Sequence, residues 1–372
     1  MRSESTIIIQ NQKPKTALAG SYLVLELTNH CNLACVHCAV YEDLQSEEGH
    51  PHYATKGYLD PELVDSLIAD WIEEKVRFDT LILFWLGEPL LHPDFGVIYK
   101  KLLRVSVEHG IFGKIEVHSN SVLLDQNRRD ILLNSASVPQ VFHCSLDANT
   151  RETYQKIKGQ DYFQQAQRNA QHFLAEKQAK GAKYPRIVLQ FIVGSNNVME
   201  AQGFRDSWEE WGAERGVFLD CVAGHVPVGE QDYIFFRQLD CPDWETQQTE
   251  NQVFADAMFQ LNISFPSPAQ EIEAKTENMS PCSGFWKSPV IDWTGEVTVC
   301  TRDNELKNCL GRLHEHRFSE LWWGEKNQGN RKEVAKGCYD GLPLCQDCFI
   351  PRSLNHAGIT QEEIADYSKG FE

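Results

Sequence analysis

Twelve cysteines are the residues of this 372-residue chain whose number and spacing point most directly to chemistry. Cys31, Cys35 and Cys38 lie in one short segment, and six others fall in the last quarter of the chain. The N-terminus lacks the apolar stretch of a secretory signal, so we expect a cytoplasmic protein in which disulfides are rare. Grouped cysteines in such a protein are typical of metal or iron–sulfur ligation, and the two groups predict two centres.

The first group supplies three thiolates without a fourth cysteine nearby. Structural zinc normally has four ligands arranged in two pairs, so a triplet fits a 4Fe-4S cluster with one open iron better. The alternatives are a zinc site completed by His37 or His52, or three buried thiols.

The second group is built around an expected β-hairpin. Cys282 and Cys300 flank this hairpin, whose turn falls near Gly295, and a hairpin brings its two ends together. Cys345 and Cys348 add a Cys-x-x-Cys pair, so four thiolates could close on one centre. Four cysteines alone do not distinguish zinc from an iron–sulfur cluster.

Six apolar segments alternate with helical ones, which predicts an α/β fold with a parallel sheet in a partial (β/α)6 barrel. In such folds the chemistry gathers at the C-terminal ends of the strands. The expected strands cover residues 22–27, 81–86, 114–118, 141–146, 186–193 and 216–222, and the expected helices cover 61–75, 96–109, 125–135, 150–178 and 199–212.

The chain is expected to divide into a core domain (1–223), a connecting region (224–281) and a C-terminal domain with a tail (282–372). Hydrophobic residues make up 42% of the chain, which excludes global disorder. The net charge of −18 opposes binding to nucleic acid and anionic lipid. The longest strongly apolar run, 81–86, is too short to cross a membrane. We therefore expect neither nucleic-acid nor membrane partners.

Residues 27–38 resemble the signature of the radical S-adenosylmethionine (SAM) superfamily, in which three cysteines have the spacing seen here. Residues 85–93 resemble the second motif of that family, although Leu86 stands where many members have glycine. Residues 119–120 and 145–147 resemble shorter elements at the ends of the third and fourth strands.

The resemblance implies that Cys31, Cys35 and Cys38 hold a 4Fe-4S cluster whose open iron chelates SAM. One-electron transfer to SAM would give a 5′-deoxyadenosyl radical, which abstracts hydrogen from a C–H bond of the substrate. The residues that the resemblance places around SAM are Gly87, Glu88, Ser119, Asn120, Ser145 and Gln190.

The C-terminal part resembles the SPASM and twitch extensions of radical SAM enzymes, which hold auxiliary 4Fe-4S clusters. Because no cysteine follows Cys348, we expect one auxiliary cluster, although Cys309 and Cys338 leave two clusters open. The auxiliary ligands that the resemblance implies are Cys282, Cys300, Cys345 and Cys348.

The function implied is that of a radical SAM oxidoreductase. The expected reaction is a two-electron oxidation of a small polar substrate, such as an aminosugar or cyclitol. The auxiliary cluster would accept an electron, and a flavodoxin- or ferredoxin-type protein would supply one. The alternatives are a maturase that modifies a ribosomal peptide or protein side chain, and a non-catalytic zinc-binding module.

A radical epimerase in which Cys221 or Cys241 donates a hydrogen atom is a further alternative. A dehydrogenase also needs a base for the hydroxyl proton, and the sequence does not select one. The candidates are Asp292, Asp303, His225 and Arg302.

Overall fold

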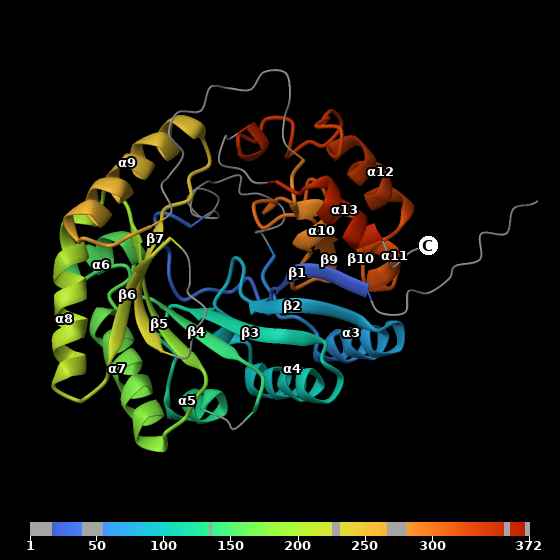
Figure 1. Cartoon of the computed structure of the whole chain (residues 1–372). Coiled ribbons are helices and arrows are strands. Elements are labelled where there is room, and N and C mark those ends of the chain that lie inside the picture. Colours follow the sequence, from blue (N-terminus) through green and yellow to red (C-terminus); the bar gives the residue numbers. More distant parts are fainter. Residues whose placement is uncertain are drawn as a thin grey trace, which may run out of the picture.

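The computed structural model describes residues 17–38, 55–133, 136–224, 231–265, 281–352 and 358–368. His52 and His225 lie outside these residues. The described chain forms one ten-stranded, mostly parallel sheet that curves into an open ring, with helices along its outer side (Figure 1). The predicted α/β class and partial barrel are confirmed. No helix within the described segments is long and apolar enough to cross a membrane.

Five strands run in sequence order along the sheet, and each pairs in parallel with the next. They are β1 (Ala17–Leu25), β2 (Val76–Leu83), β3 (Phe112–Ser119), β4 (Gln140–Ser145) and β5 (Arg186–Val193). The helices between them and after β5 are α3 (Pro61–Glu74), η1 (Pro89–Leu91), α4 (Phe95–His109), α5 (Gln126–Leu132), α6 (Arg151–Lys158), α7 (Phe163–Lys180), η2 (Val198–Glu200) and α8 (Ala201–Ala213).

Each strand presents alternate side chains to the helices. Leu23 and Leu25 of β1 are fully buried in the core between the sheet and the helices. Trp71 of α3 anchors this core, because its ring packs edge-on against Phe78 and Phe112 at centroid distances of 5.5 and 5.7 Å. The other face of the sheet, here named the inner face, points away from the helices and carries polar side chains such as His143 beside apolar ones such as Val141 and Phe235.

The sixth predicted strand is β6 (Leu219–Ala223), but it does not lie beside β5. Strand β7 (Asp232–Gln238) pairs in parallel with both β5 and β6 and so lies between them. Its residues Tyr233–Phe236 are all buried, as a central strand requires, whereas β6 is partly exposed at the edge. The 224–281 region therefore contributes a strand and helix α9 (Trp244–Gln260). The domain boundaries themselves stay a prediction.

The C-terminal part continues the same sheet beyond β1. Strand β8 (Val290–Ile291) pairs in parallel with β1, and β8, β9 (Glu296–Thr298) and β10 (Gly311–Arg312) follow as antiparallel neighbours. Gly295 adopts a φ of 86° in the β8–β9 turn, where the sequence predicted the hairpin. The remaining helices are α10 (Gly284–Lys287), α11 (Phe318–Trp322), α12 (Glu325–Val334), η3 (Ile350–Arg352) and α13 (Gln361–Ser368).

Two buried side chains join the core to the C-terminal part. Glu26 accepts hydrogen bonds from the backbone N–H of Leu86 at 3.1 Å and of Trp293 at 3.3 Å. The indole of Trp85 donates to the carbonyl oxygen of Thr301 at 2.8 Å. Burial raises the pKa of Glu26 to about 8, and the nearby carboxylate of Asp292 adds to this shift.

The raised pKa of Glu26 predicts that the stability of the protein depends on pH. Between about pH 4.5 and pH 8 the folded protein keeps a proton on Glu26 that the unfolded chain has lost, so the free energy of unfolding should fall as the pH rises. Glu26→Gln removes this titration. The fall in the free energy of unfolding across this pH range should then be smaller in the variant by on the order of 1–3 kcal/mol. Anaerobic denaturation of both holoenzymes at pH 5.5 and 8.5 measures the difference. If the free energy of unfolding changed equally with pH in wild type and variant, the raised pKa assigned to Glu26 would be refuted.

Candidate functional site

The three cysteines of the first group lie in the loop that follows β1, and this loop has little secondary structure of its own. Its backbone is held from two sides. The N–H of Glu88 donates to the carbonyl oxygen of His30 at 2.8 Å, and the N–H groups of Ala34 and Val36 donate to the end of α6 at 3.0 and 2.9 Å. A turn in which the N–H of Cys38 donates to Cys35 at 3.0 Å brings these two thiols toward one side.

Gly87 lets the second motif touch the cysteine loop. A Cβ atom at this position would lie 2.0 Å from the carbonyl oxygen of Thr28 and 2.8 Å from both the Cα of Asn29 and the carbonyl oxygen of His30. All three are backbone atoms, which cannot move aside as a side-chain tip can. The close approach of the two segments therefore requires glycine at position 87.

Glu88 ties the ends of β2 and β3 together. Its Oε1 accepts from the hydroxyl of Ser119 at 2.8 Å and from the N–H of Leu90 at 3.1 Å, and its Oε2 accepts from the N–H of Asn120 at 2.8 Å. Burial raises the pKa of Glu88 to about 7, while these three donors stabilise its charged form. The Asn120 amide also donates to Oδ1 of Asn32 in the cysteine loop at 2.8 Å. These five residues thus form one network that links the cysteine loop to the ends of β2 and β3.

A buried ion pair supports the other side of the loop. Lys158, at the end of α6, pairs with Asp147, which follows β4 and is fully buried. Asp147 also accepts from the N–H of Ile192 at 2.7 Å, and Nε2 of His37 lies 3.8 Å from its carboxylate. Lys158 is close enough to Cys35 to favour the thiolate of that residue electrostatically.

The thiols of this loop suit a metal cluster. Burial raises the pKa of the Cys35 thiol to about 11, and the charges of Cys38 and Asp147 oppose its ionisation further. Cys31, which is exposed, interacts electrostatically with both other cysteines. Three converging thiols of this kind ionise together only beside a compensating cation, and an iron–sulfur cluster supplies one. The residues present therefore fit the cluster that the sequence predicts.

The remaining predicted SAM residues lie on neighbouring strands of the inner face. Ser145 ends β4, and its register partner in β5 is Gln190. The Gln190 amide donates to the hydroxyl of Ser145 at 3.2 Å. The structure thus brings five of the predicted cofactor residues to the ends of β2, β3 and β4 and places the sixth, Gln190, beside Ser145 within β5. Their contact with SAM stays a prediction.

The second group of cysteines also converges. The thiol of Cys300 interacts electrostatically with those of Cys282, Cys345 and Cys348, and burial raises its pKa well above the ordinary value. Burial raises the pKa of the Cys345 thiol to about 12, and Cys282 and Cys348 are among its charged neighbours. The hairpin and the Cys-x-x-Cys pair therefore meet, and their ligation of one cluster stays a prediction.

Hydrogen bonds are directed at two of these sulfur atoms. The N–H of Arg302 donates to Sγ of Cys300 at 3.4 Å, and the amide of Asn308 donates to Sγ of Cys345 at 3.1 Å. Donors to cysteine sulfur are one way in which a protein sets the potential of an iron–sulfur cluster. Asn308 lies far from Cys345 in the chain and has no local sequence signal for this contact.

The spread of the thiols favours a cluster over a single zinc ion. Zinc–sulfur bonds of about 2.3 Å would hold four sulfur atoms within roughly 4 Å of one another. In the parts of the chain that the structure describes, the one set of three or more potential ligands within 4.8 Å contains no cysteine. A 4Fe-4S cube places its four cysteine ligands farther apart than a zinc ion does.

Three of the other cysteines pack in or against the protein core. Cys144 faces the helix-side core, and Cys241 is buried after β7. Cys221 also packs on the helix side, where it lines a cavity of about 400 Å³ with Arg205 and Asn262. A thiol on that side of the sheet does not face the inner face, so this placement does not favour Cys221 as a hydrogen-atom donor. Cys309 donates to the carbonyl oxygen of Gly311 at 3.6 Å.

The candidate bases have structural partners. Asp292 accepts from the N–H groups of Thr294 at 3.0 Å and Glu296 at 2.7 Å and so organises the hairpin turn. Asp303 is fully buried and accepts from the hydroxyl of Thr298 and two backbone N–H groups. Arg302 pairs with Asp240 at 3.0 Å. These contacts give each described candidate a structural role, and the base stays unassigned.

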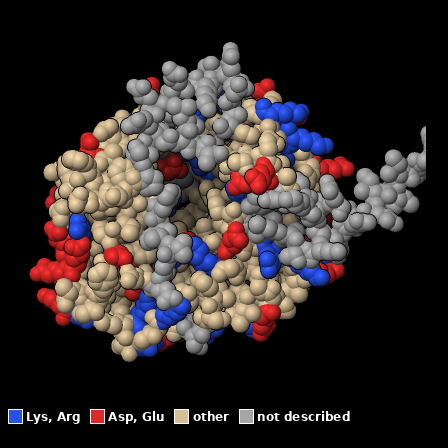
Figure 2. Space-filling view, in the orientation of Figure 1, with Lys and Arg blue, Asp and Glu red and all other residues tan. Residues whose placement is uncertain are grey.

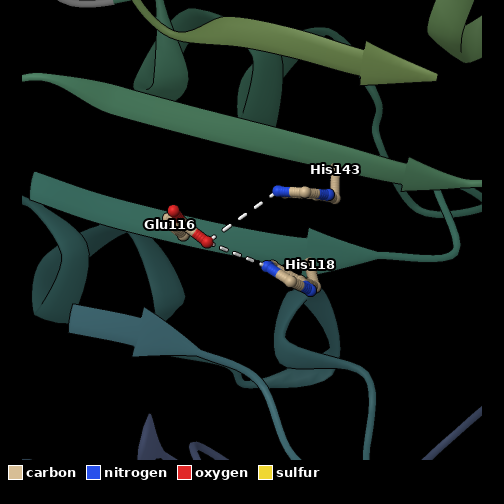
Figure 3. Close-up of side chains that lie close together, drawn as sticks. All are labelled: Glu116, His118 and His143. Carbon is tan, nitrogen blue, oxygen red and sulfur yellow. Dashed lines mark hydrogen bonds and ion pairs between the residues drawn. The ribbon is translucent and has the colours of Figure 1, made fainter. Parts of the chain in front are cut away.

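Sequence reasoning missed a polar cluster of the inner face, formed by Glu116 and His118 on β3 and His143 on β4 (Figure 3). A signal for it was present. Two polar residues two positions apart on an expected strand share one face, and a histidine on the next strand can lie beside them.

Comparison with known proteins agrees with this site. Residues 25–195 match the Radical SAM superfamily, and residues 282–349 match SPASM, an iron–sulfur cluster-binding domain. The first match contains the three-cysteine loop and the second contains the four converging thiols. The chain therefore carries a radical SAM domain and a SPASM domain. Its cofactors are a 4Fe-4S cluster, SAM and an auxiliary cluster.

Two curated relatives extend over most of the chain. Mycofactocin maturase MftC of Mycobacterium tuberculosis (strain CDC 1551 / Oshkosh) is 25% identical over 327 residues, which cover 84% of this chain and 72% of the relative. The tungsten-containing aldehyde ferredoxin oxidoreductase cofactor-modifying protein of Pyrococcus furiosus is 21% identical over 354 residues, covering 88% and 87%.

Solved structures share the fold. The structure of anSMEcpe with bound AdoMet has a TM-score of 0.55 at 15% identity and covers 94% of this chain and 92% of its own. Streptococcus suis SuiB bound to S-adenosylmethionine has a TM-score of 0.54 at 14% identity, and the match covers 87% of this chain and 73% of SuiB. At these identities the likeness extends to the fold alone.

The contact at Gly87 gives a direct test of how the first site is built. Gly87→Ala should displace the cysteine loop, so that the first site loses iron and the affinity for SAM falls at least about 10-fold. Gly329→Ala in α12 is the matched control, since a Cβ there meets no atom within 4 Å. Iron analysis and calorimetric SAM titration of the anaerobic proteins measure both effects. An alanine variant with full iron content and unchanged affinity would contradict the packing argument.

Proposed function

We propose that this protein is a radical SAM oxidoreductase that removes a hydrogen atom from a C–H bond of a polar substrate and completes a two-electron oxidation. The observation that carries the proposal is the second cysteine group. Its four thiols converge beside the core domain, and four thiolates fill the coordination of a 4Fe-4S cluster. A fully ligated cluster suits electron acceptance, since it has no open iron for a ligand.

The second group is attached to the core on both sides of the ring opening. Next to Cys300, the carbonyl oxygen of Thr301 is held by Trp85 at the end of β2. The following residue, Arg302, donates to the carbonyl oxygen of Cys241 at 2.7 Å, just after β7. Its guanidinium also stacks on Phe349 at 4.8 Å. A rigid bridge of this kind would fix the auxiliary cluster relative to a substrate at the inner face.

The inner face supports a polar substrate. It carries Lys114, Glu116, His118 and His143, and the exposed Arg237 of β7 interacts electrostatically with both histidines. The face of the molecule in Figure 2 is hollowed near its middle, with acidic and basic side chains along the margin. Charged and imidazole groups recognise hydroxyl, amino or carboxylate groups, which aminosugars and cyclitols carry.

When bound, SAM and the two clusters supply the 5′-deoxyadenosyl radical and an acceptor for the electron that the substrate radical releases. The chain positions these groups. The network of Glu88, Ser119 and Asn120 holds the first loop, and Ser145 with Gln190 would orient the nucleoside. A flavodoxin- or ferredoxin-type protein is the proposed electron donor.

A second candidate is modification of a peptide. It is favoured by one observation, the 25% identity to the mycofactocin maturase MftC over 84% of this chain. In that case the polar inner face would bind a peptide side chain. The radical chemistry would be the same, and one panel of substrates separates the two candidates.

The proposal predicts the products of one reaction and its dependence on the second group. Reduced enzyme with SAM and an aminosugar or cyclitol should give 5′-deoxyadenosine and a product two daltons lighter, measured by mass spectrometry. Cys300→Ser should lower oxidised product at least about 10-fold while 5′-deoxyadenosine still forms.

The outcomes discriminate between the candidates. Oxidation of a small polyol supports the first candidate. Turnover of a precursor peptide with none of the small substrates favours the second. Unchanged product formation by the Cys300→Ser enzyme would rule out the role assigned to the second group.

A further inference from the structure

Glu116, His118 and His143 form a compact cluster on the inner face, separate from both cysteine groups. Glu116 and His118 lie on β3, and His143 is the register partner of His118 on β4. Oε2 of Glu116 lies 3.3 Å from Nε2 of His118 and 3.8 Å from Nε2 of His143. The three ligand atoms all lie within 4.8 Å of one another (Figure 3).

Neighbouring rings fix the two imidazoles. His118 and His143 stack at a centroid distance of 3.9 Å with an interplanar angle of 27°. Phe84 stacks on the other face of His118 at 5.4 Å, and Phe235 meets His143 edge-on at 6.4 Å. Both Nε2 atoms therefore point toward the same carboxylate, which is the preorganisation that a ligand site needs.

His143 makes only a loose polar contact, with the side chain of Gln190, besides its approach to Glu116. Its exposed fraction is 2%, and neither ring nitrogen makes a hydrogen bond of normal geometry, although Gln190 lies near the ring. Buried polar groups in native proteins are nearly always satisfied. A buried imidazole aimed at a carboxylate and a second imidazole is therefore unexplained by packing alone.

We propose that Glu116, His118 and His143 bind one divalent transition-metal ion of the class of Zn²⁺ or Fe²⁺. Turning the stacked rings about their side-chain torsions would aim both in-plane Nε2 lone pairs at one ion, at the roughly 2 Å of metal bonds to imidazole nitrogen and carboxylate oxygen. Two histidines and one carboxylate are the ligands of catalytic zinc sites and of the iron facial triad, and both leave positions open.

The surroundings leave one carboxylate oxygen for the ion. Lys114 donates to the other oxygen, Oε1 of Glu116, at 2.6 Å. Lys114 and Arg237 add positive charge near the site, so the ion should bind less tightly than in an acidic pocket. The same cations would balance an anionic substrate group at the open positions. The ion would then hold a substrate oxygen at the inner face, a role that rests on the proposed function.

Metal analysis tests the site without any turnover. Anaerobic holoenzyme with intact clusters is dialysed against Zn²⁺, and bound zinc is counted per chain. The control is His172→Ala, which removes an exposed histidine. Wild type and this control should each bind one zinc ion more per chain than the double variant His118→Ala/His143→Ala. Equal zinc in wild type and the double variant would overturn the proposal.

Two further measurements test whether the loss of zinc comes from misfolding and where the ion binds. Glu116→Gln keeps the volume of the side chain and should weaken zinc binding at least about 10-fold while the iron content stays the same. Crystals soaked in Zn²⁺ should give an anomalous peak among the three side chains at the zinc edge and none below it. Absence of that peak would overturn the site. Zinc binding without substrate oxidation would leave the site standing and count against the proposed function.

Discussion

The three-cysteine loop has little secondary structure of its own, so the position of the first site depends on the contacts that hold this loop. Backbone hydrogen bonds fix it on two sides. The N–H of Glu88, after β2, donates to His30, and the N–H groups of Ala34 and Val36 donate to the end of α6, which follows β4 in the chain. Gly87 permits the first contact, and the buried pair of Lys158 and Asp147 supports the second. A cluster bound there inherits its position from the sheet.

The second constraint is that both cysteine groups depend on β1. The first loop follows the end of this strand, and β8 of the C-terminal hairpin pairs with its last residues, Val24 and Leu25. Glu26 then bonds to the second motif and to the hairpin turn at once. Sheet hydrogen bonds and a buried carboxyl group, rather than a flexible linker, therefore set the relation between the two sites.

The sequence predicted the parts of the fold with strong local signals. Strand β5 was expected over the residues it occupies, and the hairpin turn was expected near Gly295, because apolar runs and turn glycines are local features. The position of β7 was not predicted. Its segment follows a region rich in glycine and proline, and only pairing with β5 and β6 reveals it as a central strand.

The candidate site followed a similar pattern. The spacing of the cysteines predicted both groups, because the number of residues between ligands can be counted directly in the sequence. Asn308, Lys158 and the His118–His143 stack were missed, because each acts through a partner that lies far away in sequence or on another strand. Such contacts depend on register and packing, which a single sequence does not specify.

The central claim is that the loop of Cys31, Cys35 and Cys38 holds a cluster with one iron open to SAM. Electron paramagnetic resonance of the reduced, anaerobically reconstituted holoenzyme, recorded with and without SAM carrying ¹⁷O in its carboxylate, tests it most directly. The account predicts a shift of the cluster signal on SAM addition and broadening by the isotope. A cluster signal that SAM leaves unchanged would contradict it.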